Sequence, residues 1–221
     1  FSADRSNEIQ YILMHSEITH VYIDMSSVKN DWLDFLKQLR QTEGGSKYKI
    51  MVTSDRQDKE YIKELLMLGI VGFLPTTLDA ERTYLKILKI FKTTDELNQN
   101  RKHFRVSVPG ENPIKVNFRI PNTDKFITGK LTDLSIVAVA FRLDNPVDCE
   151  EIAVGNILDK VQLKINNKLA LVNLRILKSG AITVGHIVET SENTMNLISQ
   201  FIYHEMVKKV NGTHISQRVK A

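Results

Sequence analysis

Cysteine is nearly absent from this chain, because Cys149 is the only one among 221 residues. A single thiol excludes an intrachain disulfide and a multi-cysteine metal site, and it fits a reducing compartment. No apolar run is long enough to cross a bilayer and no signal peptide is visible, so we expect a cytoplasmic protein without membrane insertion. The six histidines show no zinc-type spacing, and we expect neither a metal nor a cofactor.

Catalytic signatures are also missing from the sequence. Nothing resembles a nucleophile elbow or a phosphate-binding P-loop, and Cys149 has no cationic neighbour in the sequence that would activate its thiol. We therefore expect a binding protein rather than an enzyme, with no catalytic residues. The formal net charge of +4 suits an anionic ligand but is too small for a protein that coats nucleic acid.

Basic residues in the C-terminal half offer one candidate surface for nucleic acid. These residues are Lys115, Arg119, Lys160, Lys164 and Arg175. Aromatic side chains on which bases could stack are sparse among them. We therefore rank nucleic acid low and expect no nucleic-acid partner.

The first 92 residues alternate between helical and strand patterns. Apolar residues at helical spacing predict helices around Trp32–Leu39, Ile62–Leu66 and Tyr84–Phe91. Short apolar runs between these segments predict buried strands at Val21–Asp24, Ile50–Ser54 and Val71–Leu74. Strands that alternate with helices indicate a parallel α/β sheet.

From His103 onward, apolar residues recur at every second position, which is the period of a half-buried β-strand. The predicted strands are Phe104–Val108, Ile114–Ile120, Val137–Leu143, Val161–Ile165 and Val172–Ile176. Frequent short strands favour a closed barrel or a sandwich. A helix with one apolar face, from Met195 to Met206, follows them.

Two short motifs lie at the start of this strand-rich half. Arg101 and Arg105 stand four residues apart, and the segment 133–138 (DLSIVA) follows about thirty residues later. On this strand pattern, the RxxxR pair and the [D/N]xSxxG-like turn resemble the PilZ domain, from about Arg101 to Lys209. The resemblance implies an antiparallel six-stranded β-barrel with a C-terminal helix, in a bacterial receptor of the second messenger cyclic di-GMP. The ligand-binding positions that it implies are Arg101, Arg105, Asp133, Ser135 and Ala138.

The chemistry of guanine fits the two arginines. Guanine presents O6 and N7 as adjacent acceptors that one guanidinium fork meets together, and an arginine plane also stacks on a purine. Lysine would share the attraction to the phosphodiester groups but would supply neither the fork nor the stack. The chain departs from the family pattern at Ala138, where the family has glycine. If the turn requires positive φ there, binding would be weaker.

The N-terminal segment, from Ser2 to Phe91, resembles a response-regulator receiver domain that starts late. The resemblance places Asp24 at the phosphoacceptor position and Thr53 at the switch hydroxyl. The family's Lys-Pro is replaced by Thr76-Thr77, and the acidic pair that holds magnesium belongs on an earlier strand. Because phosphoryl transfer needs a metal and a cation, we expect a pseudo-receiver in which Asp24 caps a turn instead.

We therefore expect a receiver-like domain with a partial parallel sheet over residues 1–92, a linker over 93–100 and a PilZ-like barrel domain over 101–221. Binding of cyclic di-GMP at the junction of linker and barrel would rearrange the domains and control an unidentified protein partner, bound through the N-terminal domain. Two alternatives stay open. One is a phosphorylation-controlled response regulator, and the other is a ligand-free PilZ-like adaptor that docks proteins.

Overall fold

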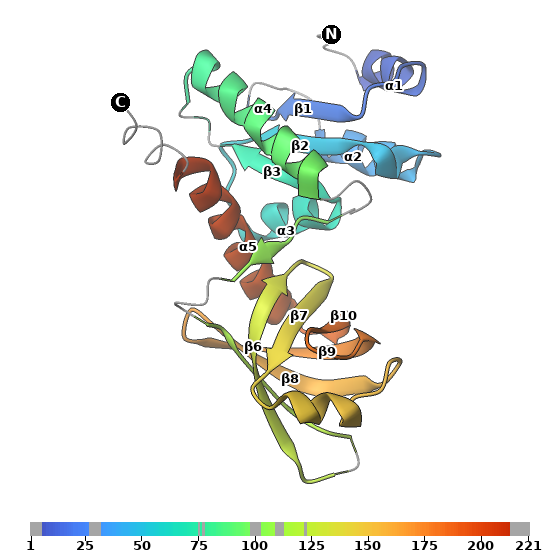
Figure 1. Cartoon of the computed structure of the whole chain (residues 1–221). Helices are drawn as coiled ribbons and strands as arrows, with labels where there is room; N and C mark the ends of the chain where they lie inside the picture. The colour runs from blue at the N-terminus through green and yellow to red at the C-terminus, as the bar shows by residue number, and fades with distance from the viewer. Residues whose placement is uncertain are drawn as a thin grey trace. The chain divides into compact units, whose positions relative to one another are not determined.

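The computed structural model describes residues 6–26, 32–74, 76, 78–97, 103–108, 113–121 and 123–212. The chain divides into two compact units. One unit contains the chain up to Phe104 together with the segment from Met206 onward, and the other runs from Arg105 to Glu205. Both units are drawn in Figure 1, and each is described here by itself.

The N-terminal unit is built on three parallel strands in the order β1-β2-β3. β1 (His20–Asp24), β2 (Lys49–Thr53) and β3 (Ile70–Leu74) agree with the predicted strands to within one residue at each end. β3 is buried along its whole length and β2 along nearly all of it, as expected of parallel strands covered on both faces. The predicted parallel sheet is confirmed, whereas the identity of this unit as a receiver stays a prediction.

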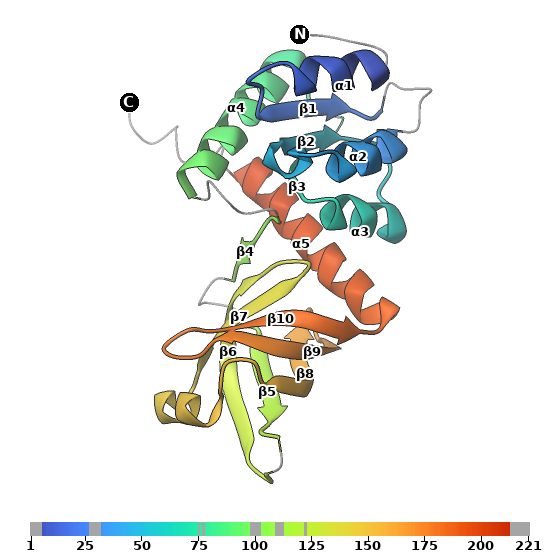
Figure 2. The same cartoon turned by 90° about the vertical axis from the view of Figure 1, so that its right-hand side faces the viewer.

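Within the described residues, four helices accompany this sheet: α1 (Ser6–Met14), α2 (Trp32–Gln41), α3 (Lys59–Met67) and α4 (Ala80–Leu97). Figure 2 shows α4 on one face of the sheet and α2 and α3 on the other. α4 continues to Leu97, so residues 93–97, which we assigned to the linker, are helical. The reason is that the sequence KTTDEL contains no glycine or proline to end the helix.

The apolar residues of α4 divide between two faces. Ile87, Ile90 and Phe91 pack against the buried Met51 and Leu74 of the sheet. On the other face, large apolar side chains remain 48–60% exposed, namely Tyr84, Leu85 and Leu88. The helical stripe predicted from the sequence is therefore split, and α4 carries an exposed apolar face of the kind that a protein-docking adaptor needs.

The second unit contains a closed barrel of six antiparallel strands, as the PilZ resemblance implied. The ring order is β6-β5-β8-β9-β10-β7, and the pairing of β6 with β7 closes it. The six strands are β5 (Lys115–Arg119), β6 (Phe126–Leu134), β7 (Ala138–Leu143), β8 (Ile157–Ile165), β9 (Lys168–Lys178) and β10 (Thr183–Thr190). The predicted strand Phe104–Val108 is reduced to the two-residue β4 (Val106–Ser107), which pairs with the end of β6.

Alternate positions of the strands fill the barrel interior. Val116 and Phe118 are buried as predicted, and the ring of Phe118 meets that of Phe141 edge to face, with centroids 5.7 Å apart. After β10 comes α5 (Glu192–Gly212), whose Ile198 and Ile202 are fully buried on the predicted apolar face. No helix among the described residues combines the length and the apolar character that crossing a bilayer demands.

Gly129 of β6 gives the first testable prediction, because the neighbouring backbone passes very close to it. A Cβ atom at Gly129 would lie 2.6 Å from the carbonyl oxygen of Arg142 on β7. We expect Gly129→Ala to lower the free energy of unfolding of the barrel by about 2 kcal/mol, since β6 and β7 must separate to admit the methyl group. Calorimetry should show a melting temperature lower by about 10 °C. The exposed neighbour Lys130→Ala is the control, and equal melting temperatures for the two variants would contradict the prediction.

Candidate functional site

The candidate ligand site lies where β4 pairs with the end of β6. Val106 faces Leu134 and Ser107 faces Asp133 in an antiparallel register. Val106 and Leu134 are fully buried, whereas Ser107 is exposed on the outer side of β4. Arg105 directly precedes Val106 in the chain, and Ser135 directly follows Leu134. The pairing thus brings the second arginine of the RxxxR motif next to the DLSIVA segment.

The segment Ser135–Ala138 forms a tight turn between β6 and β7. The backbone N–H of Ser135 donates to the carbonyl oxygen of Ala138 at 2.9 Å, and the backbone N–H of Ala138 donates to Oγ of Ser135 at 3.0 Å. The N–H of Ile187 on β10 donates to the carbonyl oxygen of Val137 at 2.9 Å and fixes the turn from the other side. Ser135 is only 1% exposed. Its hydroxyl therefore shapes the turn here, and its direct contact with a ligand stays a prediction.

Ala138 begins β7 with an ordinary backbone conformation. The non-glycine residues with positive φ in the described part of the chain are Lys160, Asn166 and Asn167, and Ala138 is not among them. Alanine in the place of the family's glycine therefore brings no backbone strain to this turn. Positive φ is therefore not required at Ala138 in this structure, and the weaker binding expected in that case does not follow.

Asp133 is held in place by a residue that we did not single out from the sequence. Oγ of Ser107 donates a hydrogen bond to Oδ1 of Asp133 at 2.8 Å. A carboxylate offers about four lone-pair sites on its two oxygens, so Asp133 can accept further hydrogen bonds from a ligand. Ser107 alternates with the apolar residues of its segment, but only the cross-strand register shows that it supports Asp133.

The two arginines of the motif differ in what the structure says of them. Arg105 is half-buried and already takes part in an interaction within the folded chain. Arg101 lies outside the described residues, and its role remains a prediction from the sequence. The structure brings Asp133, Ser135 and Ala138 together where β6 turns into β7, and Arg105 directly precedes β4, which pairs with that end of β6.

Two basic residues continue this surface, and nothing in the sequence pattern placed them here. Ala138 pairs with His186 on β10, and His186 pairs with Arg175 on β9. Both side chains are exposed. Because neighbouring strands lie about 4.8 Å apart, His186 and Arg175 extend the outer surface from Ala138 by about 10 Å. Their proximity depends on β10, which the apolar pattern did not reveal.

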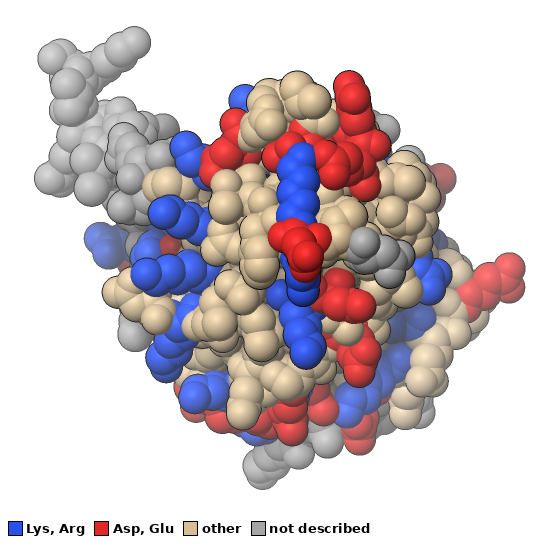
Figure 3. Space-filling view, turned by 90° about the horizontal axis from the view of Figure 1, so that it is seen from below, with Lys and Arg blue, Asp and Glu red and all other residues tan. Residues whose placement is uncertain are grey.

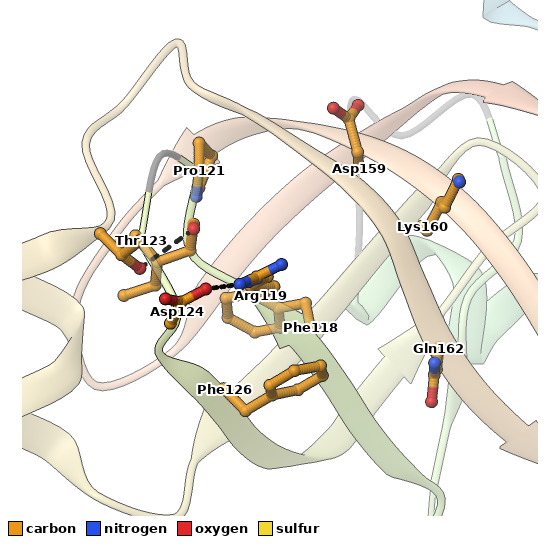
Figure 4. Close-up of a pocket in the computed structure, with 10 residues that line it drawn as sticks. Phe118, Arg119, Pro121, Thr123, Asp124, Phe126, Asp159, Lys160 and Gln162 are labelled. Atoms are coloured by element: carbon orange, nitrogen blue, oxygen red, sulfur yellow. Dashed lines mark hydrogen bonds and ion pairs between the residues drawn. The ribbon is translucent and has the colours of Figure 1, made fainter.

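A separate hollow of about 710 Å³ lies at the other end of β6 (Figure 4). Its lining includes Phe118, Arg119 and Phe126 and two residues of β8, Asp159 and Lys160. Figure 4 shows Arg119 beside Asp124, with which it forms an ion pair. Of the predicted ligand residues, the four that the structure describes do not line this hollow.

In the N-terminal unit, Asp24 caps a turn, as expected. Its Oδ1 accepts hydrogen bonds from the backbone N–H of Ser26 at 3.0 Å and from Oγ of Ser26 at 2.6 Å. Thr53 lies opposite Asp24, and its hydroxyl accepts a hydrogen bond from the hydroxyl of Tyr22 at 2.9 Å. Thr76 is exposed, and Thr77 lies outside the described residues. No group of three His, Cys, Asp or Glu residues in the described part of the chain could hold a metal ion.

Known proteins resemble the chain only in part. No curated protein matches it in sequence. The model of a family described as "TP_0454_C: C-terminal domain" matches residues 113–201. The PilZ domain with c-di-GMP of YcgR from Escherichia coli is 13% identical with a TM-score of 0.44, and the match covers 52% of this chain and 98% of that one.

Two longer solved structures give similar values. YcgR in complex with c-di-GMP from Escherichia coli is 12% identical, with a TM-score of 0.42 and coverage of 52% of this chain and 49% of that one. The Bacillus subtilis inhibitor of motility (MotI/DgrA) is 10% identical, with a TM-score of 0.40 and coverage of 52% and 53%. The matched region spans about half the length of these two proteins. Likenesses this weak do not assign a ligand to this chain.

Proposed function

We propose that this chain is a receptor that binds cyclic di-GMP on the outside of the barrel, at the surface formed by Arg105, Asp133 and the Ser135–Ala138 turn. The observation that carries the proposal is the pairing of β4 with β6. This pairing sets Ser107 against Asp133, and because Arg105 stands two residues before Ser107, it supports a site that combines the guanidinium group of Arg105 with the carboxylate of Asp133.

The two charged groups are complementary to different edges of guanine. Arg105 can donate two parallel hydrogen bonds to O6 and N7, and its plane can stack on a purine. Asp133, oriented by Ser107, can accept hydrogen bonds from the N–H donors of guanine. A base that lacks one of these edges would leave either Arg105 or Asp133 without a hydrogen-bond partner, and the binding of that base would therefore be weaker.

The phosphodiester groups of the ligand would meet the basic continuation of this surface. His186 and Arg175 lie one and two strands away from Ala138, on exposed positions. Arg175 can form charge-assisted hydrogen bonds with phosphate oxygens, and the small side chain of Ala138 leaves room for the ligand to approach the turn.

Arg101 provides the proposed link to the rest of the chain. It follows the end of α4 by four residues in the sequence. Contact of Arg101 with the ligand would draw the segment between α4 and β4 onto the barrel and change how the two units are connected. The connection between the two units would then have two arrangements, one with and one without this contact. The ligand can shift the equilibrium between them only if it binds one arrangement more tightly than the other. The exposed apolar face of α4 offers a protein partner a surface on the N-terminal unit.

Titration calorimetry of the full chain with cyclic di-GMP tests the proposal. We expect a saturable heat at micromolar ligand and a much weaker response to cyclic di-AMP, because adenine lacks the O6 acceptor and the guanine N–H donors. Circular dichroism should first establish that the protein is folded. Folded protein that releases no heat at tens of micromolar cyclic di-GMP would refute receptor function and favour the adaptor alternative. Nothing in the geometry favours control by phosphorylation, because the Asp24 carboxylate caps a turn.

A further inference from the structure

Four basic side chains form a row across four neighbouring strands on the outside of the barrel. Arg142 of β7 faces Lys130 of β6, and Lys130 faces Lys115 of β5. The register of β5 with β8, in which Val116 faces Leu163, continues by one residue to place Lys164 beside Lys115. All four side chains are exposed. We call Arg142, Lys130, Lys115 and Lys164 the basic row; it follows the curved outer wall of the barrel over four of the six strands of the ring, so its two ends point to different sides of the barrel.

In the described part of the chain, the ion pairs of the basic side chains Lys37, Arg56, Arg82, Arg119 and Lys125 involve no member of the basic row. Like charges directly opposite one another on a sheet are destabilising. Figure 3, which shows the molecule from below, has Lys and Arg side chains toward the left margin of the view and others beside Asp and Glu side chains near its centre. Such a row is stabilised when an external anionic surface approaches it.

Exposed leucines continue the basic row on the next strand. Lys164 faces Leu169 of β9, which is 56% exposed, and Leu171 is the next outward residue of β9 and is 41% exposed. These leucines are not covered by the barrel's own side chains. The outer surface of the barrel therefore places basic groups directly beside exposed apolar ones.

We propose that the end of the basic row beside β9, formed by Lys115 and Lys164, binds the surface of an anionic lipid bilayer together with Leu169 and Leu171. Basic side chains are attracted to anionic headgroups, and adjacent leucines can enter the boundary between headgroups and acyl chains. The binding is peripheral and involves no spanning segment. Single-stranded nucleic acid fits less well, because no aromatic ring lies in the row to stack on a base.

Co-sedimentation of the full chain with vesicles tests this proposal. We expect binding to vesicles of phosphatidylcholine with 30% phosphatidylglycerol, and little binding to phosphatidylcholine alone. Each basic side chain near an anionic surface contributes about 1 kcal/mol, or about fivefold in partitioning, so Lys115→Gln/Lys164→Gln should bind about 20-fold more weakly at low salt. Leu169→Ser should weaken binding without changing its dependence on salt, because it removes no charge.

Lys59→Gln/Lys178→Gln is the matched control. It removes the same charge from exposed positions outside the row, and its binding should stay close to that of the unchanged protein. Equal losses for the two double variants would overturn the proposal, since they would show an effect of net charge alone. Equal binding to neutral and anionic vesicles would also overturn it, as would binding of a single-stranded oligonucleotide with no binding to either vesicle. These outcomes leave the cyclic di-GMP proposal untouched.

Discussion

Arg105→Ala is expected to weaken the binding of cyclic di-GMP by about 100-fold or more. The substitution removes a bidentate contact to guanine that contributes about 1–3 kcal/mol, and it also removes the stacked guanidinium plane. No other described side chain on the candidate surface carries a guanidinium group at this point, directly before β4. Titration calorimetry gives the affinities, and thermal unfolding of each variant must accompany it because Arg105 also has a partner within the fold.

Two further variants test whether Arg105 acts through its positive charge or through the planar shape of its guanidinium group. Arg105→Lys keeps the positive charge but removes the two parallel N–H donors of the guanidinium group. Its affinity for cyclic di-GMP should therefore fall nearly as far as that of Arg105→Ala. Arg119→Ala removes an exposed arginine from the same barrel, at the other end of β6, and should bind as well as the unchanged protein. If Arg105→Lys binds normally, the arginine acts only as a charge, and the proposed reading of guanine is wrong.

His186→Ala measures how far the ligand surface extends beyond the motif. His186 lies one strand from Ala138 and contributes at the margin of the proposed site, so the loss should be smaller than tenfold. A loss as large as that of Arg105→Ala would move the centre of the site toward β10. If the affinity of His186→Ala equals that of the unchanged protein, the ligand contacts only the part of the surface on the β6 side of β7.

The second large effect concerns stability, and it comes from Arg40 in the N-terminal unit. Its guanidinium donates hydrogen bonds to four backbone carbonyl oxygens: to Leu68 at 2.6 Å, Gly45 at 2.7 Å, Tyr48 at 2.9 Å and Gly69 at 3.0 Å. Burial lowers the pKa of Arg40 to about 10, so the group still carries its charge at neutral pH. One side chain thereby joins α2 to the turn before β2 and to the turn between α3 and β3.

Arg40→Ala should lower the free energy of unfolding of this unit by about 4 kcal/mol, because hydrogen bonds to a charged group contribute about 1.5–3 kcal/mol each and are not additive. Trp32 is the chain's only tryptophan and is buried in this unit, so its fluorescence during urea unfolding reports the change. Arg82→Ala, which removes an exposed ion pair with Asp79, should change stability by less than about 1 kcal/mol. Similar effects of the two substitutions would refute the special role of Arg40.

Much of the N-terminal unit could be predicted because β2 and β3 are buried along all or nearly all of their length. Such strands are continuous apolar runs, and the three runs in the sequence coincide with β1, β2 and β3. The linker was less predictable, because polar residues such as Thr94 and Glu96 are as compatible with the end of an exposed helix as with a loop. The expectation that Asp24 caps a turn also held, since it depends only on its neighbour Ser26.

The barrel shows where the apolar pattern fails. β6 and β10 were not recognised, because their inward positions hold Gly129, Thr183 and Gly185, while Phe126 and Val188 point outward and remain 66% and 41% exposed. A glycine or a buried threonine faces the interior where a strand must pass close to its neighbour, and this requirement comes from the partner strand. The local sequence of β6 or β10 therefore does not reveal how closely the partner strand approaches.

The sequence by itself determined the two regimes of periodicity, the closing helix and the residue types of the motif, because each depends on neighbours within a few positions along the chain. Tertiary structure alone decided which residues share a surface. The register of β4 with β6 set Ser107 against Asp133, that of β10 with β7 and β9 added His186 and Arg175, and that of β7, β6, β5 and β8 assembled the basic row. Cross-strand register is set by hydrogen bonds and packing between distant segments, so no single segment encodes it.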